Sequence, residues 1–162
     1  MRCSWRNGAA LSPRKAEQAR LGGADLVIDY RTEDVIAKTM AFTGQRGVDR
    51  VVDVDFGGNI ATTLKLMAMN STIAVYATNG NRNPVVPMRE LMERCIALRT
   101  LVLYALPPPL LAAAQADISK WLAAGKRIHN VACQFPLSAT AQAHLAVEKG
   151  DKLGTVIVDC AR

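Results

Sequence analysis

Residues 26–54 read LVIDYRTEDVIAKTMAFTGQRGVDRVVDV, and this stretch decides the fold class. Its first run, Leu26–Tyr30, is typical of a buried strand, and Val48–Val54 is a second run of the same kind. Between them Thr32 predicts a helix start, because two acids follow it in the first turn, and Gly44 predicts the helix end. A strand, a helix and a strand in this order predict a βαβ unit and a parallel sheet.

The same alternation extends to both sides of this unit. The longest predicted helix opens at the prolines 107–109 and ends at Gly125. Four shorter helices are predicted: one that opens with Ser12-Pro13, one through Ile60 to Met67, one near Met88–Cys95, and one capped by Ser138. Further strands are predicted at Ala9–Leu11, Thr72–Tyr76, Thr100–Tyr104, Val131–Phe135 and Thr155–Val158. We therefore expect an α/β fold with a Rossmann-like, doubly wound and mostly parallel sheet.

The glycine-rich loop of such sheets does not occur in this sequence. None of the 11 glycines falls into the pattern G-x-G-x-x-G, whose backbone N–H groups approach a pyrophosphate at a helix N-terminus. We expect a truncated domain in which the first strand, this loop and the first helix are missing. In the strand order 3-2-1-4-5-6 the missing strand is central, so two long edges near Ala9 and Val48 would be exposed and would favour association.

The composition is typical of a soluble globular protein: of 162 residues, 50% are apolar and 21% are charged. The most apolar stretch, Leu101–Ala114, contains three prolines and is too short to span a bilayer. Residues 1–7 carry no apolar run of the signal-peptide kind. The sequence therefore predicts a cytoplasmic location and no membrane partner.

The cysteines and histidines, which are common metal ligands in proteins, are scattered along the chain. The four cysteines stand at positions 3, 95, 133 and 160 and form no C-x-x-C pair. His129 and His144 are isolated from them and from each other. We expect free, mostly buried thiols and no metal site.

The net charge of +6 is concentrated in part near the N-terminus, where five Lys and Arg side chains precede Asp25 and only Glu17 opposes them. Nucleic acid, a small phosphate-bearing ligand and a solvated surface each account for such a cluster. Only Trp5 is an aromatic residue among these charges, and no known nucleic-acid motif is present. We therefore expect no nucleic-acid partner.

Ser12 and Lys15 lie in the opening turn of the first predicted helix, where a doubly wound sheet binds its ligands. A lysine there opposes the helix dipole unless an anion is bound. The spacing S-x-x-K lets a hydroxyl and an ammonium converge on one phosphate, and Tyr30 adds a phenol at the neighbouring strand end. A plain N-cap serine beside an exposed lysine explains the same residues.

Two further strand ends carry polar and small residues. Asp53 and Asp55 point to the same side of a strand, which suits metal or acid–base chemistry, but a pair without further ligands is a weak signal. A tight turn at Gly57-Gly58 that lets a nucleotide pass closely is the preferred interpretation. Thr78-Asn79-Gly80 is placed to contact a nicotinamide or its ribose, and is equally a generic turn. No catalytic side chain is identified, because no Ser-His-Asp, Cys-His or H-E-x-x-H arrangement can be assembled.

These residues together resemble a known family. SPRKAE at residues 12–17 and GADLVIDYRTED at residues 23–34 are similar to the zinc-independent quinone oxidoreductases of the medium-chain dehydrogenase/reductase superfamily, the zeta-crystallin group. The similarity continues through Gly47–Asp53, the Gly57-Gly58 turn, Gly80, Phe135-Pro136-Leu137, Ala143-His144, Glu148 and Gly154–Val158.

The resemblance implies NADPH-dependent hydride transfer to quinones, enones or related carbonyls. Such enzymes use no zinc and act mainly by placing the nicotinamide against the substrate. The resemblance assigns Ser12, Lys15 and Tyr30 to the 2′-phosphate. The nicotinamide side is assigned to Thr78, Asn79, Leu103 and Tyr104. It further implies a homodimer, in which the edge strand Leu101–Tyr104 pairs across a two-fold axis.

In that family a substrate domain precedes the nucleotide-binding domain, and residues 1–8 match none of it. We expect residues 9–128 to form a partial NADP-binding Rossmann domain. Residues 129–162 are expected to form a strand–helix–strand segment that packs on the absent substrate domain. The predicted function is that of a truncated homologue of a quinone or enone oxidoreductase. The alternative is a non-enzymatic module for nucleotide binding or oligomerisation.

Overall fold

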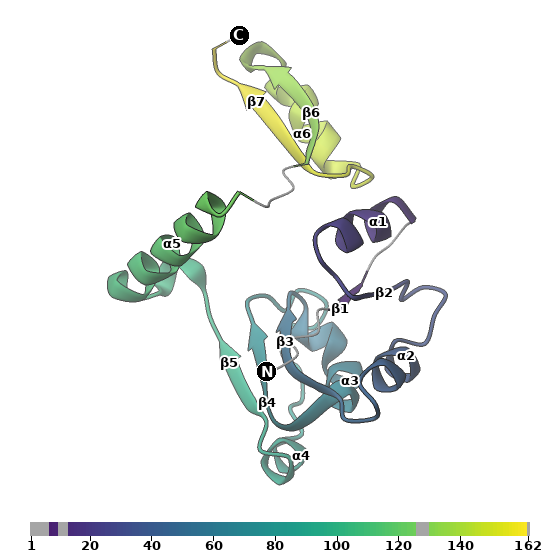
Figure 1. Cartoon of the computed structure of the whole chain (residues 1–162). Helices are drawn as coiled ribbons and strands as arrows, with labels where there is room; N and C mark the ends of the chain where they lie inside the picture. Colours follow the sequence, from purple (N-terminus) through teal and green to yellow (C-terminus); the bar gives the residue numbers. More distant parts are fainter. Residues whose placement is uncertain (1–6, 10–12, 126–129, 162) are drawn as a thin grey trace. The chain divides into compact units, whose positions relative to one another are not determined.

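The computed structural model describes residues 7–9, 13–125 and 130–161 (Figure 1). It divides into two compact units. The central unit is Tyr30–Ala123, and the terminal unit combines Met1–Asp29 with Ala124–Arg162. Each unit is considered by itself below.

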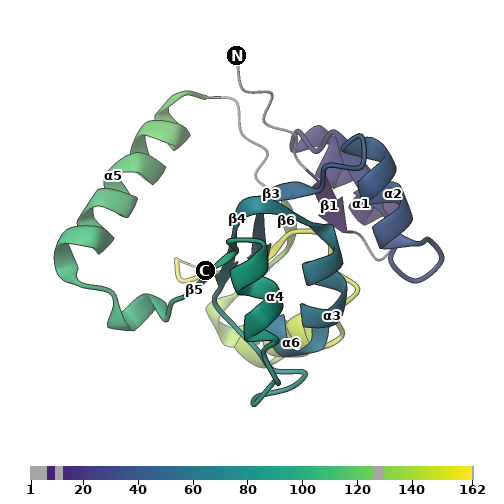
Figure 2. The same ribbon diagram turned by 90° about the horizontal axis from the view of Figure 1, so that it is seen from below.

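The central unit contains a three-stranded parallel sheet. Its order is β3 (Val48–Asp53), β4 (Met67–Val75) and β5 (Ala97–Thr100). The helices α3 (Phe56–Leu66) and α4 (Met88–Glu93) lie on one side of this sheet, as Figure 2 shows.

The core of the central unit lies between this sheet and the two helices. Alternate β4 residues point into it, so that Ile73 and Val75 are buried while Ala74 is half-buried. The other buried members of the cluster are Phe56, Leu64, Met67, Leu91 and Ile96. The helix α2 (Val35–Phe42) contacts α3.

The terminal unit contains two short parallel pairs. In one, β1 (Asn7–Ala9) pairs with β2 (Leu26–Ile28), and α1 (Pro13–Leu21) connects them. In the other, β6 (Val131–Pro136) pairs with β7 (Thr155–Asp159).

The helix α6 (Thr140–Glu148) joins β6 to β7 and lies along this pair (Figure 1). Ala143 of α6 is 4% exposed, and in the other pair Ile28 of β2 is 1% exposed. Each pair is thus a strand–helix–strand unit with one face covered by its own helix.

The predicted fold class is confirmed, because every strand pair described is parallel and helices connect the strands. The pairs β2-β1 and β3-β4-β5 are those of positions 3-2 and 4-5-6 in the doubly wound order. Within the described residues, β1 pairs only with β2 and β3 only with β4. Both strands therefore keep one unpaired edge in this part of the chain.

Two helix starts differ from the prediction. The N-cap of α2 is Asp34 and not Thr32, because the Asp34 carboxylate accepts a hydrogen bond of 2.9 Å from the Ala37 N–H. A 3-10 turn at Leu137–Ala139 precedes α6, so Ser138 does not cap that helix. The two helix starts predicted from prolines are correct, since α1 begins at Pro13 and α5 (Pro108–Ala123) begins at Pro108.

The strand predicted at Leu101–Tyr104 is wrong in position. β5 ends at Thr100, and the Leu101 N–H makes one further bond of 2.9 Å to the Val75 carbonyl. The partner strand β4 ends at Val75, so no strand residue remains opposite to continue the ladder. The chain turns instead into a 3-10 helix at Leu103–Ala105, and the four predicted strand residues are exposed.

Other strand bounds shift by a few residues. β4 begins at Met67, five residues before the predicted start, and β2 ends at Ile28 rather than Tyr30. Of the first predicted strand, Ala10 and Leu11 lie outside the described residues, as does Ser12. Strand ends depend on where the neighbouring strand stops, which a single sequence does not reveal.

Candidate cofactor-binding site

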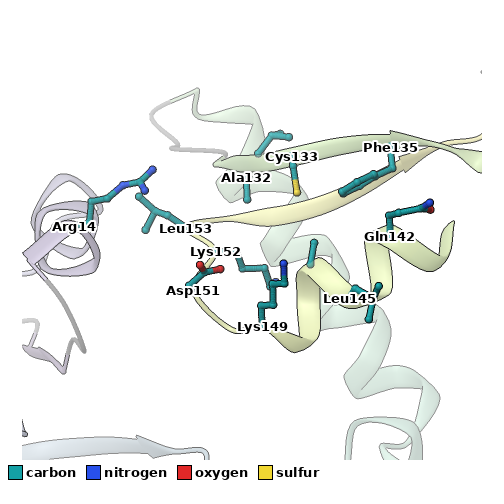
Figure 3. Close-up of a pocket in the computed structure, with 12 residues that line it drawn as sticks. Arg14, Ala132, Cys133, Phe135, Gln142, Leu145, Lys149, Asp151, Lys152 and Leu153 are labelled. Carbon is teal, nitrogen blue, oxygen red and sulfur yellow. The ribbon is translucent and has the colours of Figure 1, made fainter. Parts of the chain in front are cut away.

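A pocket of about 620 Å³ opens in the terminal unit between α1, β6, α6 and the loop before β7 (Figure 3). Three cations line it, namely Arg14 of α1 and Lys149 and Lys152 of the loop, and Asp151 is the one acid among its lining residues. Cys133 and Phe135 of β6 supply part of its apolar wall. We call it the basic pocket. Its excess of positive charge suits an anionic ligand.

Lys15 contacts the same loop that carries Lys149 and Lys152. Its ammonium donates a hydrogen bond of 3.4 Å to the Gly150 carbonyl. In a second bond, of 2.6 Å, the side-chain amide of Asn130 donates to the side-chain amide oxygen of Gln18, one turn further along α1. These two bonds connect α1 to the segments that flank β6 and β7, and they place Lys15 beside the basic pocket.

Sequence reasoning found Lys15 but missed the three cations of the pocket. Lys149 and Lys152 stand 134 and 137 residues after Lys15, and only the fold brings them to α1. The signal available in the sequence was the pair of lysines flanking Gly150 at a helix end, which reads equally as a solvated turn. Arg14 was visible as part of the N-terminal charge cluster.

The other residues predicted for the 2′-phosphate are not tested by this geometry. Ser12 lies outside the described residues. Tyr30 belongs to the central unit, two residues after β2, and its side chain is 49% exposed. Their convergence with Lys15 stays a prediction.

In the central unit, two strand ends exchange hydrogen bonds. The Asp55 carboxylate accepts from the Gly80 N–H at 2.7 Å, while the Gly57 N–H donates to the Thr78 hydroxyl at 3.0 Å. The Thr78 hydroxyl in turn donates to the Asn81 carbonyl at 2.7 Å. We call this arrangement the clasp. It fixes the loop after β4 against the start of α3.

The first two N–H groups of α3 are bonded by the loop after β4 and not by the N-cap side chain of the helix. Asp55 is the N-cap of α3 but makes no side-chain bond to its own helix. The first-turn N–H groups are taken instead by the loop, with Phe56 bonded to the Ala77 carbonyl at 3.2 Å and Gly57 to Thr78. These two donors are therefore already occupied by protein groups and are not available to a phosphate.

The clasp also explains the Gly57-Gly58 pair. A Cβ on Gly57 would overlap the Asn81 carbonyl, and one on Gly58 would lie 2.5 Å from an Asp55 carboxylate oxygen. The tight turn expected at these glycines is present, and the atoms nearest to them belong to the chain's own loop. Passage of a nucleotide at this turn stays a prediction. Close packing of two turns requires the glycines here.

Asp53 has a structural role beneath the clasp. It is 4% exposed, and one carboxylate oxygen accepts from the Asp55 N–H at 2.8 Å and from the Asn59 amide at 2.9 Å. The other oxygen accepts from the Thr63 hydroxyl at 3.3 Å. Asp53 and Asp55 therefore serve different partners and do not form a joint acid–base pair.

The residues predicted for the nicotinamide side lie at two places in the central unit. Thr78 is in the clasp, and Asn79 beside it is exposed. Leu103 and Tyr104 line an apolar groove of about 510 Å³. Its other lining residues are Val52, Ala74, Tyr76, Leu101 and Val102.

A comparison with protein families shows to which family the chain belongs. A family model described as zinc-binding dehydrogenase matches residues 22–158 of the chain. The chain belongs to the zinc-binding dehydrogenase family. Membership of the medium-chain dehydrogenase/reductase superfamily, predicted from the sequence, is thereby confirmed. A search of curated proteins gave no match to the chain.

Solved structures of similar fold include quinone oxidoreductases and an alcohol dehydrogenase. A mycobacterial quinone oxidoreductase is 22% identical with a TM-score of 0.79, over 93% of this chain and 47% of its own. An Escherichia coli quinone oxidoreductase complexed with NADPH is 22% identical with a TM-score of 0.76, over 94% and 49%. An NAD-dependent alcohol dehydrogenase is 22% identical with a TM-score of 0.77, over 94% and 43%.

The family member described here spans less than half the length of these solved chains. The described residues contain no group of three or more His, Cys, Asp or Glu side chains arranged to hold a metal ion. Nor does any helix within the described ranges have the length and apolar character needed to cross a membrane.

Proposed function

We propose that this chain binds NADPH as part of an oxidoreductase that transfers hydride to a small quinone, enone or carbonyl. The observation that carries the proposal is the basic pocket with Lys15 beside it. A 2′-phosphate distinguishes NADPH from NADH and carries close to two negative charges at neutral pH. Several cations from separate elements are what such a group requires.

The residues present fit the phosphate of this cofactor. Lys15, Arg14, Lys149 and Lys152 would hold it, and Ser12 and Tyr30 are proposed to add hydroxyl groups. Thr78, Asn79, Leu103 and Tyr104 of the central unit are proposed for the nicotinamide side. The clasp leaves the first donors of α3 occupied, so the pyrophosphate is not assigned to that helix end.

When bound, the cofactor supplies the hydride, and the chain's own residues bind it, orient it and exclude water. The groove beside Leu103 and Tyr104 supports an apolar acceptor, because none of its lining residues carries a formal charge at neutral pH. We propose a zinc-independent reaction, as the resemblance of the sequence to the zeta-crystallin group implies.

We also propose that residues 9–128 and 129–162 form two domains, that the protein is cytoplasmic and that it forms a homodimer. For the homodimer, we propose the edge strand β5 at Ala97–Thr100, which is followed by the exposed segment 101–104.

Titration of the purified chain with NADPH and NADH tests the proposal, with nucleotide fluorescence as the readout. We expect NADPH to bind more tightly, and Lys149→Ala to weaken NADPH about 10-fold while leaving NADH unchanged, as loss of one charge-assisted contact implies. Lys120→Ala is the matched control, because Lys120 is an exposed lysine of α5 that pairs with the equally exposed Asp117. Equal affinity for both nucleotides in the wild-type chain would refute the 2′-phosphate assignment.

A second function, oligomerisation, is favoured by the edge of β3 that has no strand partner among the described residues. Val52 on this strand is 75% exposed and Val54 just after it is 56% exposed. An exposed apolar edge strand is a template for pairing with another chain. This function does not require turnover, and the two proposals are compatible.

A further inference from the structure

The loop after β4 owes its position to one carboxylate from another strand end. Asp55 holds the Gly80 N–H at 2.7 Å, and an isolated antiparallel bridge joins Asp55 to Thr78. The hydroxyl of Thr78 is bonded on both sides, to the Gly57 N–H and to the Asn81 carbonyl. Asn79 lies between these two anchored residues with its side chain exposed.

Such anchoring has an energetic consequence for any ligand of the loop. A loop that must be ordered on binding loses conformational entropy at that moment, and the affinity falls accordingly. Here the ordering is complete before a ligand arrives, because every bond of the clasp is made within the chain. The carboxylate of Asp55 makes the charge-assisted bond of the set, so it is the strongest single restraint.

We propose that Asp55 is a positioning residue, which presets the Thr78-Asn79 loop for the nicotinamide half of the nucleotide. The inference rests on the proposed function, since it assumes that NADPH binds. Asp55 itself does not touch the cofactor in this scheme. It acts through the Gly80 backbone, and the buried Asp53 holds Asp55 in turn through the Asp55 N–H.

The packing around Asp55 provides an internal check. A Cβ on Gly80 would overlap the same Asp55 carboxylate oxygen that a Cβ on Gly58 would approach. Gly80→Ala therefore has to displace the carboxylate or the loop. In an Asp55→Ala background this conflict disappears, so the effects of the two substitutions on affinity should be strongly non-additive.

The test compares NADPH with adenosine 2′,5′-bisphosphate, which carries the 2′-phosphate but no nicotinamide. We expect Asp55→Ala to weaken NADPH about 10-fold, as one charge-assisted hydrogen bond implies, and to leave the bisphosphate unchanged. Asp55→Asn keeps an acceptor oxygen and should restore most of the NADPH affinity. Glu93→Ala is the control for loss of an exposed carboxylate in the same unit.

The outcomes separate the inference from the proposed function. NADPH affinity unchanged by Asp55→Ala, or equal weakening of both ligands, would overturn the positioning role while leaving NADPH binding intact. If the wild-type chain binds neither ligand, the proposed function fails and the inference with it. If Asp55→Ala does not fold, Gly80→Ala gives the same comparison, with selective loss of NADPH affinity expected and equal loss for both ligands contradicting the inference.

Discussion

The Arg94 guanidinium donates a hydrogen bond of 2.7 Å to the Leu64 carbonyl, 30 residues earlier in the chain. It also bonds the Met67 carbonyl, and it pairs with Glu90 at 3.3 Å. Leu64 lies in the last turn of α3, where its carbonyl also accepts a hydrogen bond from the N–H of the C-cap residue Met67. A cation at this end also complements the negative pole of the helix dipole. Arg94 thus joins the end of α4 to the turn between α3 and β4.

We expect Arg94→Ala to lower the free energy of unfolding by about 2 kcal/mol, because it removes a charged donor that bonds two carbonyls in a partly buried position. Urea denaturation followed by circular dichroism measures this value. Arg89→Ala is the matched control: Arg89 is 91% exposed and pairs with Glu93, and such surface pairs contribute at most about 1 kcal/mol. Equal losses for the two variants would show that Arg94 does not cap α3.

Substitutions at Asp53 should show whether its hydrogen bonds or its negative charge stabilises the fold. Asp53→Ala removes the acceptor of three donors in a buried position and is expected to cost about 3 kcal/mol of unfolding free energy. Asp53→Asn retains one acceptor oxygen for Asp55 and Asn59, while the new amide can donate to the Thr63 hydroxyl. We expect it to cost less than half as much in the same denaturation experiment. A loss as large as that of the alanine variant would mean that the negative charge itself is required.

Val52→Lys tests the oligomerisation function. A charge on an exposed edge strand opposes pairing with another chain, and at 75% exposure the lysine can reach water without disturbing the core. We expect the variant to have a lower average mass in sedimentation velocity, with an unchanged unfolding midpoint. Val85→Lys is the control, because Val85 is 90% exposed and lies outside the strands. An unchanged distribution of masses for Val52→Lys would exclude this edge as the contact.

The sequence predicted the fold class and the positions of most helices and strands. These depend on the spacing of apolar residues and on prolines and glycines, which act on the local backbone. It placed the starts of α1 and α5 at their prolines, and the fold class from residues 26–54 is confirmed. The prediction was wrong where the bounds of an element depend on its neighbours in the fold. The strand expected at Leu101–Tyr104 has no partner once β4 ends at Val75. The helix cap expected at Thr32 is formed instead by Asp34, two residues later.

The candidate site shows the same division. Lys15 was identifiable because a lysine in a first helical turn is locally unfavourable. Lys149 and Lys152 join it only through the packing of α1 beside the loop before β7, which no local pattern encodes. The two aspartates were visible as a pair, but their separate partners lie 6 and 25 residues away, in α3 and in the loop after β4.

Gly80, 22 residues after Gly58 in the sequence, shares one small volume with Gly58 and Asp55. Gly58 and Gly80 both face a single oxygen of Asp55, so a larger residue at either glycine is compatible only with a shorter or reoriented side chain at position 55. Substitutions at these sites should therefore be inherited together across relatives of this chain. An aligned set of such sequences would then reveal the clasp as a correlated triplet, even where overall identity has fallen too low to trace ancestry by other means.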